Sequence, residues 1–135
     1  MSIELEKRGA VAVMTFNRPE KLNAMTSEMR QQMEQRLIEV RDDPGIRALV
    51  MTGAGKAFCT GGDIRTFASS TPAVMRDRIK QQHRVTLSLY HLEKPVIAAV
   101  NGAAFGSGFN LALLGDIILA SDTARFCQSY PRKSI

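Results

Sequence analysis

The sequence predicts an α/β fold in which a parallel sheet is covered by helices on both faces. Short apolar runs that suit buried strands, such as residues 96–100 and 117–120, alternate with longer segments of helical periodicity. Two short predicted strands are each followed by a glycine-rich loop, around residues 60–63 and 102–108. A helix is predicted to begin directly after each loop. A chain of 135 residues is long enough for one domain with a sizeable core, so residues 1–135 are expected to form a single unit.

The first half of the chain predicts a hairpin, a helix and a strand. Residues 3–5 and 11–15 fit two short strands that turn at Arg8-Gly9. Thr26 is the predicted N-cap of a helix that runs to about Arg41, before residues 42–45 end it. Residues 46–52 then predict a strand. The helix carries apolar residues on one face, namely Met25, Met29, Met33, Leu37 and Val40.

The second half predicts two more helical segments before the last strands. Residues 63–69 fit a short helical turn. Thr71-Pro72 predicts the start of a long helix to about Leu92, because proline is well tolerated at the first helical position. The buried face of this helix is expected to change midway, since its apolar positions drift along the helix. They are Met75, Ile79, Val85, Leu89 and Leu92.

Composition and charge indicate a soluble globular protein. Hydrophobic residues make up 44% and charged residues 23% of the chain, and neither a membrane-spanning run nor a signal peptide is recognised. Cys59 and Cys127 lack metal-ligand or redox spacing, so free thiols in a reducing, cytoplasmic compartment are expected. The net charge of +5 is modest: it helps to attract a polyanion, but most of the charged residues are expected simply to solvate helices.

The two glycine loops predict a site for developing negative charge. Glycine lets the backbone approach a ligand closely, and free N–H groups follow such turns. Two N–H groups directed at one oxygen form an oxyanion hole.

Four motifs together resemble the enoyl-CoA hydratase/isomerase (crotonase) family. They are NRPEKLNA at 17–24, FCTGGDI at 58–64, VNGAAFGSG at 100–108 and GDIILA at 115–120, in the family's order and over essentially the whole chain. The resemblance implies a crotonase-type spiral core of ββα units and an acyl-CoA thioester as substrate. It implies that the reaction uses no metal and no redox cofactor. It also implies that the complete protein is a homo-oligomer, either a trimer or a hexamer.

The resemblance also assigns roles to residues of this chain. The backbone N–H groups of Gly62 and Ser107 match the oxyanion donors, and Asn110 stands at a catalytic position. The residues that match CoA contacts are Lys21, Leu22, Ala24, Thr60, Gly62, Asp63, Ile64 and Tyr130.

The sequence departs from the family's hydratases at both proton-transfer positions. Asn110 and Tyr130 stand where hydratases carry glutamates, and neither an amide nor an ordinary phenol is a good base at neutral pH. The chain is therefore expected to be of isomerase rather than hydratase type. It resembles the epoxyphenylacetyl-CoA and enoyl-CoA isomerases, whose single base is an aspartate expected about three residues beyond Ile135. We expect a chain truncated before the C-terminal helical region, and inactive by itself.

Alternatives from other classes stay open. A catalytically inactive CoA-binding or scaffold protein fits Asn110 and Tyr130, and Asn110 either orients a ligand or water or caps local backbone. Asp63 is more simply a cap of the short helix, Asp116 is structural, and His83 and His91 lack the partners of a metal site. RNA binding is the weaker hypothesis, because acidic residues dilute both basic rows and favour solvated helix faces. Those rows are Arg30, Arg36 and Arg41, and Arg76, Arg78, Lys80 and Arg84.

Overall fold

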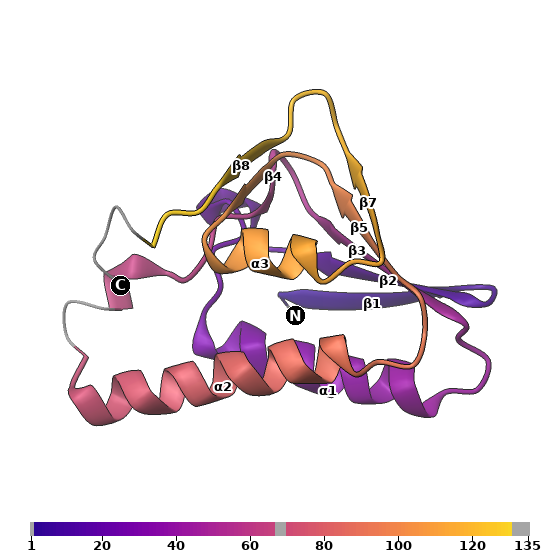
Figure 1. Ribbon diagram of the computed structural model, residues 1–135, viewed down its shortest axis with the longest axis horizontal. Coiled ribbons are helices and arrows are strands. Elements are labelled where there is room, and N and C mark those ends of the chain that lie inside the picture. The colour runs from indigo at the N-terminus through magenta and orange to yellow at the C-terminus, as the bar shows by residue number, and fades with distance from the viewer. Residues whose placement is uncertain (1, 67–69, 131–135) are drawn as a thin grey trace.

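The computed structural model describes residues 2–66 and 70–130 and shows a mixed α/β architecture with two sheets (Figure 1). The first sheet has five strands in the order β1-β2-β3-β5-β7. Its members are β1 (Ile3–Arg8), β2 (Val11–Phe16), β3 (Ala48–Gly53), β5 (Val96–Val100) and β7 (Ile117–Ala120). Only β1 runs antiparallel to its neighbour, and the other pairs are parallel. The predicted α/β class and its mainly parallel sheet are confirmed.

A second, three-stranded parallel sheet was not predicted. It consists of β4 (Ala57–Cys59), β6 (Ala103–Phe105) and β8 (Arg125–Cys127), in that order. Each strand has three residues, which is too short for a periodic pattern to stand out in the sequence. This small sheet matters because β4 and β6 lead directly into the two glycine loops.

The helices α1 (Ser27–Asp42) and α2 (Pro72–Tyr90) lie side by side, and the short α3 (Ser107–Leu113) packs on β4, β5 and β6 (Figure 1). Both predicted caps are confirmed, since the hydroxyls of Thr26 and Thr71 accept hydrogen bonds from the N–H groups of Met29 and Val74. Two 3-10 turns complete the chain, η1 (Pro19–Lys21) and η2 (Ile64–Thr66). Residues 67–69 of the predicted helical turn lie outside the described residues.

The predicted apolar face of α1 forms much of the core, with Met29, Met33, Leu37 and Val40 all buried against the first sheet. The prediction for α2 is correct only for its C-terminal half, where Val85 and Leu89 are buried.

The N-terminal half of α2 buries Arg78 and Gln81 and leaves Ile79 about half exposed. The predicted apolar face is therefore wrong in this half of α2. The Arg78 guanidinium donates a hydrogen bond to the Asp63 carbonyl, just before η2, and so the side of the helix that carries Arg78 faces inward. Met75 is only half-buried.

Two further predictions about burial are wrong. The basic rows are not simply solvated faces, because Arg30 and Arg78 are buried, at 3% and 9% exposure. The first sheet is also not covered throughout. Strand β7 lies at its edge, bonds only to β5, and has all four residues exposed.

Candidate functional site

The loop of residues 17–25 is held in shape by the buried amide of Asn23. Its Oδ1 accepts the Arg18 N–H at 2.8 Å, and its Nδ2 donates to the carbonyls of Ala54 and Ala57 at 2.9 and 2.8 Å. Leu22 and Asn23 both have positive φ, at 50° and 56°, so the chain turns sharply here. One amide therefore ties this loop to the start of β4.

The first glycine loop is joined to the same segment by a short parallel bridge. The Met25 N–H donates to the Gly61 carbonyl at 2.7 Å, and the Asp63 N–H donates to the Met25 carbonyl at 3.1 Å. Gly61 has φ of 92°, which favours glycine. Between these two bonds, the Gly62 N–H has no acceptor within residues 2–66 and 70–130.

The second glycine loop presents the other predicted donor. Gly106, with φ of 53°, donates its N–H to the Cys127 carbonyl at 2.9 Å, and α3 begins at the next residue, Ser107. The Ser107 N–H lies in the first turn, where no helical carbonyl reaches it, and the described part of the chain offers it no other acceptor.

The two loops lie against each other. A Cβ built on Gly61 would be 3.6 Å from the Ser107 nitrogen and 3.0 Å from the Phe105 carbonyl oxygen. A Cβ on Gly108 would be 2.0 Å from the Cys59 carbonyl oxygen, so α3 packs almost backbone to backbone on β4. Glycine at these positions thus brings Gly62 and Ser107, the predicted oxyanion donors, into neighbouring loops.

Asp63 joins three arginines directly beside the first loop. Its carboxylate accepts hydrogen bonds from Arg65 Nη2 at 2.7 Å and Arg18 Nη1 at 3.0 Å, and its backbone carbonyl accepts one from Arg78 Nη2 at 3.2 Å. The Arg65 guanidinium and then Arg18 hold the pKa of Asp63 well below its usual range, against the opposing effect of desolvation. Its Oδ1 also accepts the Arg65 N–H at 3.2 Å, so Asp63 caps η2 as the simpler prediction had it.

Most of the predicted CoA contacts line one pocket of about 310 Å³. Leu22 lies beside it, exposed, and its carbonyl accepts hydrogen bonds from the Thr60 N–H and hydroxyl at 3.2 and 3.0 Å. Tyr130, the remaining predicted contact, is not in this pocket. The lining residues are Lys21, Ala24, Thr60, Gly62, Asp63, Ile64 and Arg65, of which only Arg65 was not predicted.

Asn110 and Tyr130 instead meet in a separate cavity of about 490 Å³ between α2 and α3. The Asn110 Oδ1 accepts a hydrogen bond from Gln128 Nε2 at 2.9 Å. Burial raises the pKa of the Tyr130 phenol, so the phenol stays protonated at neutral pH and cannot accept a proton there. Gln82 and His83 also line this cavity. Their positions on α2 are not part of any motif, so the sequence did not predict them as site residues.

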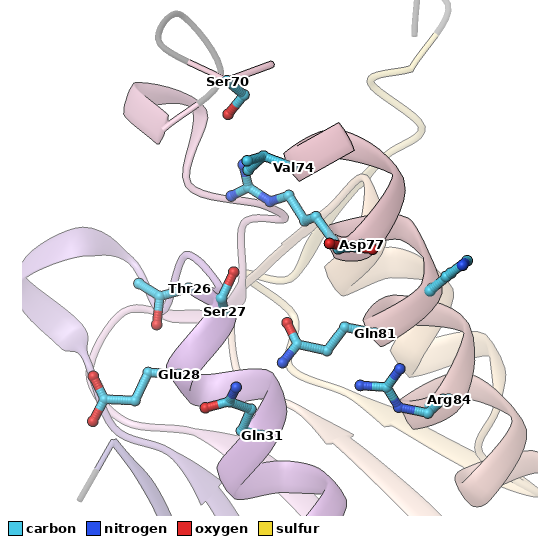
Figure 2. Close-up of a pocket in the computed structure, with 11 residues that line it drawn as sticks. Thr26, Ser27, Glu28, Gln31, Ser70, Val74, Asp77, Gln81 and Arg84 are labelled. Carbon is cyan, nitrogen blue, oxygen red and sulfur yellow. The ribbon is translucent and has the colours of Figure 1, made fainter. Parts of the chain in front are cut away.

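A larger hollow, about 830 Å³, lies elsewhere, between the N-terminal halves of α1 and α2. Its lining includes Thr26, Glu28 and Gln31 on the α1 side and Gln81 and Arg84 on α2 (Figure 2). Neither glycine loop and none of the predicted site residues lines this hollow. The candidate site is therefore assigned by its chemistry and not by the size of the hollow.

Asp116 and the two cysteines lie outside the candidate site. The Asp116 carboxylate accepts the Val96 N–H at 2.8 Å and so stabilises the start of β5. Cys59 and Cys127 are free thiols. Among the described residues, no group of three His, Cys, Asp or Glu side chains is placed to hold a metal ion, and no helix has the length and apolarity to cross a membrane.

Comparisons with known proteins agree with this geometry. The family model for enoyl-CoA hydratase/isomerase matches residues 6–133. A short-chain-enoyl-CoA hydratase of Clostridium acetobutylicum is 42% identical over 128 residues, which cover 94% of this chain and 49% of that protein. A 1,2-epoxyphenylacetyl-CoA isomerase of Escherichia coli is 40% identical over 126 residues, covering 90% and 48%.

Superposition on a solved structure supports the same family at the level of the fold. The crystal structure of an enoyl-CoA hydratase from Polaromonas sp. JS666 superposes with a TM-score of 0.93 at 34% identity, covering 98% of this chain and 53% of that one. The crotonase-type core predicted from the motifs is therefore confirmed. The chain spans about half the length of the curated relatives it matches.

Proposed function

This chain belongs to the enoyl-CoA hydratase/isomerase family, and from that premise we propose that it binds acyl-CoA thioesters and stabilises their enolates. The observation that carries the proposal is the pair of unbonded N–H groups of Gly62 and Ser107 on touching loops. In the proposed complex, the pocket of Lys21, Thr60 and Asp63 holds CoA, and the thioester oxygen accepts hydrogen bonds from both N–H groups.

Two fixed donors act on the charge that develops during the reaction. When a base takes a proton from the carbon next to the thioester carbonyl, the electrons of that C–H bond form a C=C bond and the carbonyl π electrons move onto the thioester oxygen. Both N–H groups then donate to that oxygen. Such donors are in place before the reaction and need no reorganisation, and each contributes roughly 10²–10³ in rate. The proposed chemistry therefore needs neither a metal nor a redox cofactor.

We propose an isomerase rather than a hydratase. Isomerisation moves one proton from one carbon to another through the enolate, and one base suffices. Hydration requires groups that activate water and deliver a proton, and Asn110 and Tyr130 supply no carboxylate for this. Asn110, fixed by Gln128, is instead suited to orient the bound acyl group.

The test compares binding, polarisation and turnover by this chain. Calorimetry with butyryl-CoA is expected to show binding, and infrared difference spectra of a ¹³C-labelled thioester are expected to show its carbonyl stretch at lower frequency. Crotonyl-CoA hydration and 3-enoyl-CoA isomerisation are then followed side by side, and the 135-residue chain by itself is expected to catalyse neither reaction. Rapid hydration would show that the catalytic groups are misplaced.

A catalytically inactive CoA-binding protein is the second candidate, favoured by the amide and phenol at positions 110 and 130. It is supported if the thioester binds with a shifted carbonyl stretch and neither reaction occurs even in a chain extended by the aspartate segment that the resemblance implies after Ile135. RNA binding is disfavoured, because burial removes Arg30 and Arg78 from the two basic rows. Salt-sensitive RNA binding below micromolar concentration at physiological ionic strength would reverse this.

For the complete protein we propose a cytoplasmic location and a homo-oligomer, trimer or hexamer. The free thiols of Cys59 and Cys127 support a reducing compartment, and exposed apolar residues on β7 support an interface. Light scattering over a concentration series tests the assembly, and a monomer at all concentrations would contradict it.

A further inference from the structure

The Arg30 guanidinium is buried in α1 without an acidic partner. The residue is 3% exposed, its Nε donates to Gln82 Oε1 at 2.9 Å, and its Nη1 is buried with no hydrogen-bond partner among the described residues. None of the ion pairs within residues 2–66 and 70–130 includes it. A buried charge without a counter-ion costs several kcal/mol, so this position is suited to an anion.

The neighbours of Arg30 leave its charge unbalanced. Burial, and next the positive charge of Arg78, lower the pKa of Arg30 to about 10, so it stays charged at neutral pH. The Cys59 thiol and the Tyr130 phenol lie near enough to act on it, but burial raises the pKa of both, to about 11 for Cys59. Both groups are therefore neutral at pH 7 and supply no negative charge.

Gln82 connects this charge to the cavity of Asn110 and Tyr130. An arginine only donates hydrogen bonds, so Arg30 fixes the Gln82 amide with its oxygen inward. The Gln82 Nε2 then has a single weak contact, 3.4 Å to Thr86 Oγ1, and is available as a donor. Among the residues that the structure describes, no acidic side chain lines the cavity, whose walls are Ile79, Gln82, His83, Thr86, Asn110, Leu113, Leu114 and Tyr130.

We propose that this cavity takes acyl groups that end in a carboxylate, so that the substrates are monothioesters of dicarboxylic acids. The carboxylate accepts a hydrogen bond from Gln82 Nε2, and the Arg30 guanidinium behind the amide balances its charge. The inference rests on the proposed function, which places the thioester at Gly62 and Ser107 and the acyl chain along α3 towards α2.

The test compares two saturated thioesters of equal chain length, glutaryl-CoA and pentanoyl-CoA, by calorimetry on the 135-residue chain. We expect glutaryl-CoA to bind about tenfold tighter, in line with a hydrogen bond to a charged group. Arg30→Met and Gln82→Leu are each expected to abolish this preference while still binding pentanoyl-CoA. Arg84→Met is the matched control, because Arg84 is an exposed arginine on α2 that pairs with Glu34, and it is expected to keep the preference.

The possible outcomes separate this inference from the proposed function. Equal binding of both thioesters by the unmodified chain, or a preference that survives in Arg30→Met, overturns the carboxylate site alone. Binding of neither thioester overturns the proposed function together with it. Binding of pentanoyl-CoA by Arg30→Met also shows that the variant folds. Thermal unfolding gives a second readout, since glutaryl-CoA is expected to raise the Tm of the unmodified chain more than that of Arg30→Met.

Discussion

Replacing Asp63 by asparagine tests whether the ion pairs beside the first glycine loop hold the site together. The substitution keeps the shape of the side chain and removes the charge that Arg18 and Arg65 share. The Asp63 side chain is 7% exposed and that of Arg18 is 19% exposed, so solvent compensates little for the loss of this pair. We expect Asp63→Asn to lower the free energy of unfolding by about 3 kcal/mol, the lower end of the range for removing one partner of a buried ion pair.

Arg65→Gln provides the matched control for this prediction. Arg65 bonds to the same carboxylate, but its side chain is 58% exposed, so water replaces it readily. Its loss is expected to change stability much less than Asp63→Asn. Urea unfolding followed by circular dichroism measures both variants, and equal losses would refute the assignment of the stabilisation to the Arg18–Asp63 pair.

The pH dependence gives an independent measurement of the same interaction. Arg65 and Arg18 lower the folded-state pKa of Asp63 below its unfolded value of about 3.9. The folded state therefore binds fewer protons than the unfolded state, and the stabilisation is full above about pH 5 and is lost as the pH falls through the folded-state pKa. Between about pH 5 and pH 2 the stability of Asp63→Asn is expected to fall less steeply than that of the unmodified chain. Parallel curves would contradict the lowered pKa.

Three further predictions follow from close packing and burial. Gly108→Ala places a Cβ 2.0 Å from the Cys59 carbonyl oxygen and is expected to lower the free energy of unfolding in urea by about 3 kcal/mol or more. Its control, Gly9→Ala, has positive φ but open space around the Cβ and is expected to cost about 1 kcal/mol. Similar values for the two variants would argue against backbone contact of α3 with β4. Asn23→Ala removes the three hydrogen bonds of a buried amide and is expected to cost about 3 kcal/mol, against almost nothing for Asn17→Ala, whose bond to Glu4 is exposed. Iodoacetamide at pH 7.5 is expected to label Cys127 and not Cys59, because burial raises the pKa of Cys59 to about 11; peptide mass spectrometry showing rapid labelling of Cys59 would contradict this.

The long elements were predictable because their signals are local. Met29, Met33 and Leu37 repeat at helical spacing, and Thr26 supplies the cap, so α1 follows from residues close in sequence. The glycine loops were predictable for the same reason, since the motifs that contain Gly62 and Ser107 each occupy a few consecutive residues.

Burial of charge was not predictable, because its cause is distant in sequence. Arg30 looks like one member of a basic row until α2 places Gln82, 52 residues later, against it. Arg78 looks the same until the loop at Asp63 accepts its hydrogen bond. The strand expected just before the first glycine loop is confirmed as β4, but β6 and β8 and their pairing with β4 were missed, since each is defined by its partners and not by a pattern of its own.

The contacts around Asp63 join the two halves of the proposed site. Arg18 Nη1 donates to both the Ala24 carbonyl and the Asp63 carboxylate, so one guanidinium joins the loop proposed to hold CoA to the loop that presents Gly62. The bridge between Met25 and Gly62 fixes the same two segments through backbone bonds. An oxyanion hole is effective when its donors are held before the substrate arrives. In this chain the arginine, the carboxylate and the bridge hold Gly62, so the proposed binding of CoA and the proposed polarisation of its thioester rely on the same few residues.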